Sequence, residues 1–306
     1  VANATVAVGD AELARVISEV RNDVRHAYYE VVAADERARI ADDLRGLAER
    51  ARNAARARVN AGDVPQSDLT QAELVLANSE NDVAAARGEA SATRADLNAL
   101  LGQAVDVPLT LTDTLTAGAL PSAADALAQA TAGNGELRVL DRRLAEQTAR
   151  VDLTKSLRTP DIAAGGSFVY DAEPEFRYGW RVSFGVTLPI LASHKPAVVF
   201  EEGTLARLQA ERAAIIARIS GGIGAALARA TAARERITRY EGTILPLAAE
   251  AERQAQAAYT GGQTGLTALV QALQLARDTR QRGLDAGLDY QRALADLERA
   301  IGAPIK

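Results

Sequence analysis

Apolar residues recur at helical spacing through most of the chain, and the runs stop at glycines. The apolar positions that follow Gly62 are Leu69, Ala72, Leu76 and Val83. A spacing of three and four residues is typical of one buried helix face. The pattern predicts a helix that ends near Val59, a turn at Gly62, and a returning helix that ends at Gly102. Side-chain oxygens of Ser67 and Asp68 are expected to cap the returning helix.

The second half of the chain repeats the first at a fixed offset of 200 residues. The matches include Ala55 with Ala255, Gly62 with Gly262, Leu69 with Leu269, Gln71-Ala72 with Gln271-Ala272, Ala95-Asp96-Leu97 with Ala295-Asp296-Leu297, and Leu101-Gly102 with Ile301-Gly302. No gap is needed between these matches. Solenoid units run about 20 to 50 residues, so a period this long indicates one helical hairpin used twice. The second hairpin is expected to turn at Gly262, with Thr264 capping its returning helix.

A segment with a period of two lies between the hairpins and predicts two strands, residues 162–170 and 179–188. In the second strand Trp180, Val182, Phe184, Val186 and Leu188 share one face, while Arg181, Ser183, Gly185 and Thr187 share the other. A soluble hairpin with one buried face explains this alternation. Taken alone, the alternation favours this soluble interpretation. The strand length and a cluster of Tyr170, Tyr178 and Trp180 also fit a tilted transmembrane pair joined by an exposed loop, residues 171–177. Two strands cannot close a barrel, so the membrane interpretation requires other chains.

The helix that leads into the second turn can run from about Ala197 to Ala258, which is on the order of 90 Å. We expect bends or a short break in it at Gly221-Gly222, Gly224 and Pro246. Uninterrupted apolar runs of the roughly 18 to 20 residues that span a membrane are not found in the sequence. The expected fold class is therefore mainly α with a small β part.

Composition supports long packed helices and argues against several functions. Only 4% of the 306 residues are aromatic, and alanine dominates. The chain has 35 basic and 40 acidic residues without a basic patch, which argues against nucleic-acid binding. There is no cysteine, so disulfides and thiolate metal sites are excluded.

Catalysis and cofactor binding have few candidate residues. The two histidines, His26 and His194, have no second metal ligand at suitable spacing, so we predict no metal site and no cofactor. The glycines at 221–222 and 261–262 lack the following Gly-Lys-Ser/Thr of a phosphate loop. The adjacent carboxylates Asp42-Asp43 and Glu201-Glu202 diverge by about 100° on a helix. We therefore predict no enzyme, and Arg52, Arg56 and Arg58 are expected to form ion pairs or partner contacts.

The order of these features resembles the TolC-like outer-membrane efflux family over nearly the whole chain. The residues that carry the resemblance are Arg58 to Gly62 with Ser67-Asp68-Leu69 and Gln71-Ala72, Tyr259 to Gly262 with Leu269, Thr159-Pro160-Asp161, and Pro189 to Leu191. Within the family, the sequence is most similar to outer-membrane factors of resistance-nodulation-division pumps. Among these it resembles the heavy-metal efflux branch.

The resemblance implies a homotrimer in the outer membrane with a periplasmic extension. Each protomer gives four strands to a twelve-stranded barrel and its helices to an α-barrel tunnel. It implies a passive conduit that exports metal ions or small toxic compounds. The implied partners are a periplasmic adaptor (membrane fusion) protein, an inner-membrane pump that supplies the energy, and outer-membrane lipid. The competing interpretation is a soluble coiled-coil adaptor or structural assembly protein; a helical enzyme would need a pocket that nothing in the sequence predicts.

The resemblance also implies which residues dock the adaptor, form the gate and face the membrane. It places Gly62, Asp63, Val64, Gly262, Gln263 and Thr264 at the periplasmic tip where adaptors dock. Family members carry gate aspartates after the second turn, but the positions here are Ala268 and Gln271. Asp68 occurs only in the first copy, so Asp68 and Gln271 are the gate candidates, with Asp63 able to add to an acidic ring. The residues expected to face the membrane are Trp180, Val182, Phe184 and Val186.

The expected organisation has three parts. Residues 1–158 form the first repeat, with a helical hairpin, an equatorial segment at about 103–121 and a helix over 122–158. Residues 159–191 form the strand pair, and residues 192–306 form the second repeat. Applying the repeat offset to the strand pair puts its counterpart before Val1, so the amino-terminal strand pair is expected to be absent from this sequence.

Overall fold

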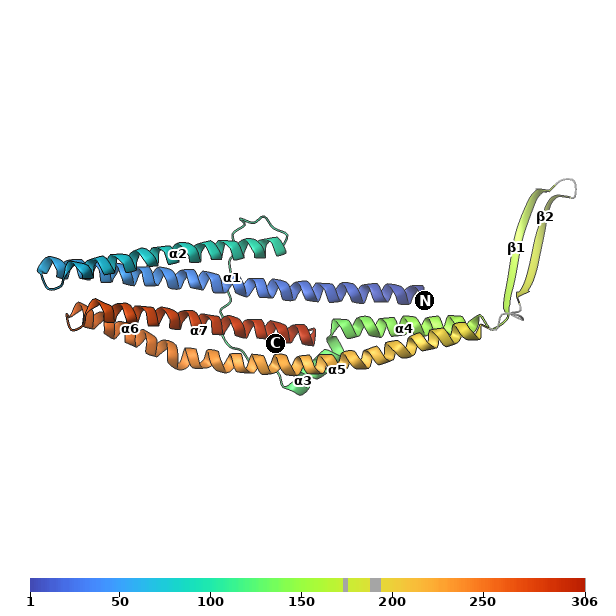
Figure 1. Ribbon diagram of the computed structural model, residues 1–306. Helices are drawn as coiled ribbons and strands as arrows, with labels where there is room; N and C mark the ends of the chain where they lie inside the picture. Colours follow the sequence, from blue (N-terminus) through green and yellow to red (C-terminus); the bar gives the residue numbers. More distant parts are fainter. Residues whose placement is uncertain (173–175, 188–193, 306) are drawn as a thin grey trace. The chain divides into compact units, whose positions relative to one another are not determined.

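Two long helical hairpins dominate the computed structural model, which describes residues 1–172, 176–187 and 194–305 (Figure 1). The first hairpin consists of α1 (Ala2–Ala61) and α2 (Gln66–Leu100). The second consists of α6 (Leu245–Thr260) and α7 (Leu266–Ile301), with α6 continuing the longer α5 (Lys195–Arg239). The mainly helical fold class with a small β part is confirmed.

The glycines of the repeat end helices as predicted. Gly62, Gly102, Gly262 and Gly302 have φ values of 82°, 68°, 71° and 81°. At both hairpin turns the two hydrogen bonds of a Schellman motif follow: Gly62 N–H donates to Val59 O and Asp63 N–H to Arg58 O, at 3.0 and 2.9 Å. Gly262 and Gln263 donate to Tyr259 and Ala258 in the same way, at 3.1 and 2.8 Å. A left-handed φ favours glycine, which explains why these four positions match across the repeat.

The predicted side-chain caps are wrong. The cap position of α2 is Pro65 and that of α7 is Gly265, and neither helix has a side-chain capping hydrogen bond. Ser67 and Asp68 lie inside the first turn of α2, where Asp68 N–H donates to Pro65 O at 3.1 Å. Pro65 has the extended backbone that a cap position needs, so the helix begins two residues earlier than a Ser67 cap would place it.

The chain divides into two compact units, one formed by residues 1–16 and 133–218, the other by residues 17–132 and 219–306. The second unit contains the whole second hairpin and all of the first hairpin except the start of α1. Its core lies at their turns, where α1, α2 and α7 contribute apolar residues around Tyr259. The buried members of this cluster are Ile40, Leu44, Leu47, Ala51, Ala55, Leu69, Ala72, Tyr259, Leu266, Leu269 and Leu273. Leu69 and Leu269 hold equivalent places in it, so the repeat extends to the packing.

Heptad spacing explains how these helices pack. In α7 the buried positions Leu269, Ala276, Gly283, Tyr290 and Leu297 recur every seven residues. In α2 the buried residues Leu69, Val83, Ala90 and Leu97 follow the same period. This is the spacing of helices that wind gently around one another. Of the predicted apolar face Leu69, Ala72, Leu76 and Val83, all are buried except Leu76, which is half-buried.

The equatorial segment 103–121 has no regular secondary structure and is held by side chains of the helices. The buried Asn98 donates Nδ2 hydrogen bonds to the carbonyls of Val105 and Val107, at 3.1 and 2.9 Å. Further along, the Tyr290 hydroxyl receives a bond from Gly118 N–H and donates to Gly118 O, at 3.0 and 3.1 Å. These bonds satisfy main-chain groups that a loop would otherwise leave unpaired.

The single helix predicted over 122–158 is divided into α3 (Ala123–Gly133) and α4 (Gly135–Ser156). Asn134 separates them because its Oδ1 accepts hydrogen bonds from Glu136 and Leu137 N–H, at 3.0 and 3.3 Å. This asparagine cap was not predicted from the sequence. The division into three sequence domains remains a prediction.

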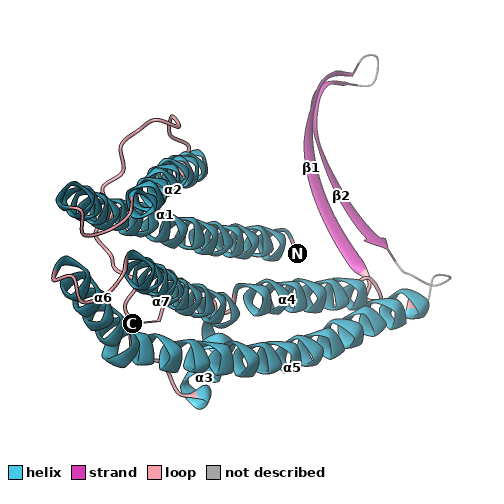
Figure 2. Ribbon diagram, turned by 60° about the vertical axis from the view of Figure 1, so that its left-hand side comes forward, coloured by secondary structure: helices cyan, strands magenta, loops and turns pink. Residues whose placement is uncertain are grey.

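The first unit joins α4 to parts of α1 and α5 through polar contacts. Arg143 binds Glu12 at 2.6 Å, and Arg212 binds Asp141 at 2.6 Å. The adjacent carboxylates diverge as predicted: Glu201 accepts from Gln147, while Glu202 binds Lys155 at 2.8 Å. Figure 2 shows α4 and α5 running side by side.

The predicted break in the long second helix occurs at only one of its two expected places. Gly221, Gly222 and Gly224 lie in unbroken α5. A five-residue π-helix, η1 (Tyr240–Ile244), precedes α6 instead, and Pro246 is the second residue after it. Proline has no N–H to donate and crowds the preceding turn, so it interrupts a helix more strongly than glycine.

Two antiparallel strands, β1 (Asp161–Ala172) and β2 (Phe176–Thr187), form the only sheet in the part of the chain that the structure describes. The pairing sets Ile162 opposite Val186 and Phe168 opposite Trp180. Both strands are longer than predicted, since the expected loop 171–177 contributes residues to each. Residues 173–175 and Leu188 lie outside the described residues, as do the side chains of Tyr170 and Tyr178.

Candidate functional site

The two hairpin turns form the first candidate site. Gly62 and Asp63 are exposed, as are Gly262 and Gln263, while Val64 and Thr264 are half-buried. The Oγ1 atom of Thr264 is buried and has no hydrogen-bond partner among the described residues. The turns therefore present mostly main-chain and small polar groups on their outer side. Their role in adaptor docking remains a prediction.

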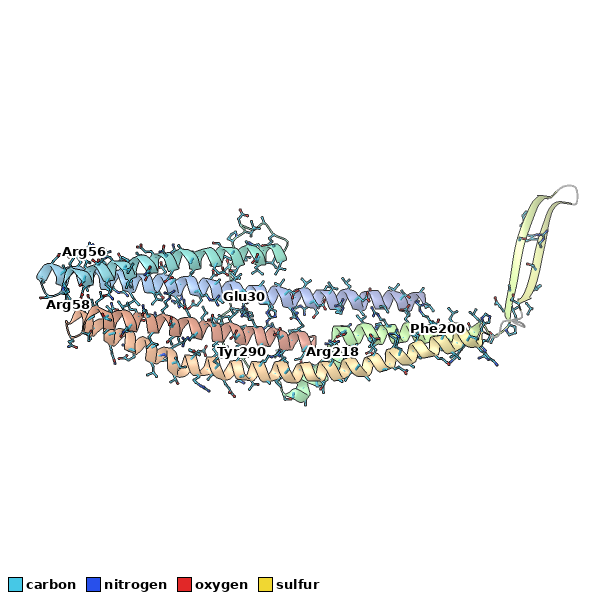
Figure 3. All side chains as sticks on the ribbon, viewed as in Figure 1. Glu30, Arg56, Arg58, Phe200, Arg218 and Tyr290 are labelled. Carbon is cyan, nitrogen blue, oxygen red and sulfur yellow. The ribbon has the colours of Figure 1, made fainter. Side chains whose placement is uncertain are left out.

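Arg58 connects the two turns. Its Nη1 donates to the main-chain oxygen of Tyr259 at 3.3 Å, and its guanidinium carbon lies 5.2 Å from the centre of the Tyr259 ring. A cation over an aromatic face is attracted to it by about 0.5–2 kcal/mol, depending on exposure. Figure 3 labels Arg58 and Arg56 near the end of the first hairpin. We call this contact the tip clasp, formed by Arg58 and Tyr259.

Tyr259 is completely buried, and its hydroxyl has no hydrogen-bond partner in the described chain. Burial raises the pKa of this hydroxyl above its ordinary value because the charged phenolate would be poorly solvated. The Arg58 charge opposes this shift, and the Asp68 carboxylate adds to it. The gate candidate Asp68 therefore lies close enough to the tip clasp to act on it electrostatically.

The second gate candidate is placed differently. Gln271 is exposed on α7, whereas Asp68 is half-buried at the start of α2. Among the residues that the structure describes, neither side chain forms a hydrogen bond or an ion pair. The gate assignment of both residues remains a prediction.

The other tip arginines form ion pairs, as expected. Arg56 binds Glu73 of α2 at 3.1 Å, and Arg52 lies 4.0 Å from Glu49 within α1. Both pairs stay inside the first hairpin. Arg58 is therefore the tip arginine that reaches the second repeat.

The strand pair carries the second candidate site, an apolar belt. One face carries large apolar side chains, all of them exposed: Ile162, Phe168, Trp180, Val182, Phe184 and Val186. The exposed fraction is 83% for Trp180 and 80% for Phe184. Phe168 and Trp180 stack edge to face with ring centres 5.0 Å apart. The opposite face carries small or polar residues, among them Gly165, Arg181, Ser183 and Gly185.

This exposure bears on the two interpretations of the alternation. A soluble hairpin would bury its apolar face, but no described residue covers the belt. Clusters of this size on a soluble surface are rare and indicate contact with a partner or a membrane. The exposed belt thus weighs against the soluble adaptor.

A membrane-spanning helix was not expected, but one stretch meets the criteria of length and composition. An 18-residue window within Lys195–Thr260 has a mean hydropathy of 1.3, and 22% of it is buried. This mean hydropathy comes from alanine, isoleucine and glycine with few charged residues among them, not from an uninterrupted apolar run. One such helix also occurs in soluble proteins, so we assign no membrane span to it.

Two features of these sites were missed from the sequence. The tip clasp joins residues 201 positions apart, and only the near match to the repeat offset pointed to their proximity. The π-helix has a clearer signal, because the buried Ile237 before it and the half-buried Leu245 after it are out of phase. The seven-residue steps to Ile237 and those from Leu245 are separated by eight residues.

Comparisons with known proteins agree with the fold. Residues 1–103 match the family model described as outer membrane efflux protein. The chain is 26% identical over 304 residues to the cobalt-zinc-cadmium resistance protein CzcC of Cupriavidus metallidurans, covering 98% of this chain and 72% of that protein.

Solved channel structures have the same fold. The open-state MtrE outer membrane channel of Neisseria gonorrhoeae superposes with a TM-score of 0.79 at 19% identity, covering 99% of this chain and 71% of MtrE. CusC gives 0.77 at 17% identity, covering 97% and 71%. The outer membrane protein VceC of Vibrio cholerae gives 0.75 at 15% identity, covering 100% and 75%. The resemblance stated from the sequence is confirmed.

Proposed function

We propose that this chain, which is similar to outer membrane efflux proteins, is one protomer of a trimeric, passive efflux channel at the outer membrane. Members of this family form trimeric channels within tripartite pumps. In this proposal the strand pair lies in the membrane and the helical hairpins extend into the periplasm. The energy comes from an inner-membrane pump, and the chain itself performs no catalysis.

The apolar belt is the observation that carries the proposal. A two-stranded sheet has two unpaired edges, and in a bilayer each unpaired N–H or C=O group costs several kcal/mol. Strands from other protomers would pair these edges and close a barrel. The belt would then face lipid, while Arg181, Ser183 and Gly185 would face the water-filled interior, as in membrane barrels with alternating faces.

The hairpins would supply the conduit and its entrance. We propose that Gly62 to Val64 and Gly262 to Thr264 contact a periplasmic adaptor, and that Asp68 together with the tip clasp controls opening. Gln271 would line the entrance, where related channels carry an acidic side chain. A resistance-nodulation-division pump is the proposed energy source.

The proposed cargo is metal cations, with small toxic compounds as the alternative. The support is the similarity to a protein named for cobalt, zinc and cadmium resistance, at 26% identity. A passive duct does not need to hold its cargo at a fixed site. The pump would therefore determine which compound is exported.

A pair of charge substitutions on opposite strand faces tests the membrane placement. Phe184→Arg puts a cation on the belt, which costs about 2–4 kcal/mol near the bilayer centre. Ser183→Arg puts the same cation on the opposite face and serves as the control. We expect Phe184→Arg to reduce the trimer recovered from outer membranes at least about tenfold, with Ser183→Arg close to wild type. Equal recovery of the two variants contradicts the proposal.

A further inference from the structure

The packed positions of α5 and α6 are spaced by seven residues, except at one step, which contains one extra residue. Ile223, Ala230 and Ile237 in α5 are buried and spaced by seven residues. Leu245, Glu252 and Tyr259 continue with the same spacing on the far side, but Leu245 follows Ile237 by eight. The π-helix Tyr240–Ile244 takes up this residue, and Leu245 N–H accordingly donates to Tyr240 O, five residues back. The buried stripe therefore faces α7 on both sides of the interruption.

The opposing helix is weakened at the same level. Gly283 and Gly287 are one helical turn apart in α7, and glycine is among the least favourable residues inside a helix. A Cβ atom at Gly283 would lie 3.2 Å from Leu245 Cδ2. At Gly287 it would lie 3.0 Å from the Cβ and the carbonyl oxygen of Leu115 in the equatorial segment. The two glycines thus form a notch that receives the first residue after the π-helix and the equatorial segment.

Room for movement exists beside this notch. An open cavity of about 710 Å³ is bounded by Glu241 and Leu245 on one side and by Gly283, Leu284 and Gly287 on the other. On the side of the notch nearer the tip, Arg280 forms an ion pair with Glu252 at 2.7 Å. This pair lies between α6 and α7 where an apolar layer would be expected. Apolar interdigitation is therefore incomplete where α6 begins.

The first hairpin has neither weakness. Positions Ile40 to Leu44, which correspond to the π-helix by the repeat offset, lie in uninterrupted α1. Val83 and Arg87 occupy the places of the two glycines. The π-helix and the two glycines therefore occur in the second hairpin and have no counterpart at the equivalent positions of the first.

A ladder of ion pairs between α1 and α7 holds the part of α7 beyond the notch. Asp23 binds Arg299 at 2.6 Å, and Arg37 binds Asp285 at 2.7 Å. Between them lie the pairs Arg25–Glu298, His26–Asp296 and Glu30–Arg292. From one pair to the next, the residue number in α1 rises by about as much as the residue number in α7 falls. The register between the two helices is therefore constant. The ladder ends at Asp285, next to Gly283.

We propose that the π-helix Tyr240–Ile244 and the glycine notch Gly283/Gly287 form a hinge about which the tip of the second hairpin moves. The ladder and the equatorial segment fix α7 on one side of this hinge. On the other side α6 and the first half of α7 pivot together, and the tip clasp closes or opens. The inference rests on the proposed channel function, because the movement is what would open the entrance.

Removing the extra residue tests the hinge. The variant that lacks Thr243 and carries Pro246→Ala restores an uninterrupted heptad from α5 to α6. The chain has no cysteine, so spin labels at Asp63→Cys and Gln263→Cys report the separation of the two tips. In detergent-purified trimers assembled from a few labelled chains and an excess of unlabelled chains, we expect two distances between the tips of one protomer for the parent and loss of the longer one in the variant. A single distance in the parent, or two unchanged distances in a folded variant, overturns the hinge.

A milder substitution keeps the test valid if the deletion does not fold. Gly283→Ala stiffens α7 and fills the notch against the flexible Leu245 side chain. Gly88→Ala in α2 is the matched control, because nothing lies within 4 Å of its new Cβ. We expect Gly283→Ala to reduce the longer-distance population about fivefold, the factor that the helix preference of alanine over glycine corresponds to. Equal effects of the two substitutions overturn the hinge.

Failure of the channel function has a separate readout. The oligomeric state of the labelled protein reports it, since a soluble monomer argues against the channel whatever the label distances are. A trimer whose tips do not respond to either variant argues against the hinge alone.

Discussion

Arg58 and Tyr259, from different copies of the repeat, form the direct contact between the two hairpin tips. The arginine donates to the tyrosine carbonyl at 3.3 Å, and its charge lies 5.2 Å from the ring centre. The contact leaves the tyrosine hydroxyl without a partner. The contact adds a polar link to the apolar cluster that packs the two tips together.

Arg58→Ala should loosen both tips, because it removes the hydrogen bond and the ring contact. We expect hydrogen exchange to rise about tenfold in residues 55–72 and also in 255–273, corresponding to a loss of about 1–2 kcal/mol. Arg56→Ala is the control, since Arg56 binds Glu73 within the first hairpin. Exchange that rises in the first segment alone would show that the clasp does not couple the hairpins.

Tyr259→Phe and Tyr290→Phe should change stability in opposite directions. Both side chains are fully buried, but the Tyr290 hydroxyl makes two hydrogen bonds to Gly118 and the Tyr259 hydroxyl makes none. Removing an unpaired buried hydroxyl is neutral or stabilising, whereas removing a paired one costs about 1–3 kcal/mol. Urea unfolding of the two variants measures this. A destabilised Tyr259→Phe would mean that the hydroxyl has a partner in the assembled protein.

Alkaline pH should weaken the tip through Tyr259. Its folded pKa is raised by burial, so the unfolded chain releases the proton first, near the usual tyrosine pKa of about 10. The associated stability is fully present below pH 10 and is lost as pH rises through the folded pKa. We expect the unfolding free energy of the parent to fall above pH 10 more steeply than that of Tyr259→Phe. Parallel pH profiles would contradict this assignment.

Asn98→Ala should release the start of the equatorial segment. The side chain is fully buried and binds two carbonyls, which would be left unpaired. We expect a loss of about 2–3 kcal/mol in urea unfolding. Glu298 holds the corresponding place in the second copy, where its Oε1 accepts from Ile305 N–H at 2.7 Å. Glu298→Gln would keep this acceptor but would also weaken the pair with Arg25, so it is not a matched control for Asn98→Ala. An Asn98→Ala variant as stable as the parent would contradict the explanation.

The turns and the strand faces could be predicted because their signals are local. Gly62 and Gly262 need a left-handed φ that few other residues adopt, and the alternation from Trp180 to Val186 fixes which side chains share a face. The exposure of that face was not predictable, because alternation looks the same whether the covering is protein or lipid.

The errors arose where a local signal competed with packing. Ser67 looked like a helix cap, but Pro65 begins the helix earlier. Gly221 and Gly222 looked like a break, but α5 continues through them because its buried positions stay in phase. The true interruption at Tyr240 to Ile244 follows from a phase shift that appears only when buried positions on both sides of Pro246 are compared.

The most direct test of the central claim is the mass of the detergent-solubilised protein extracted from outer membranes, measured by light scattering with the detergent subtracted. We expect a trimer, because the exposed belt and the free strand edges need other copies to form a closed barrel. A protein that remains monomeric and soluble without detergent would contradict it.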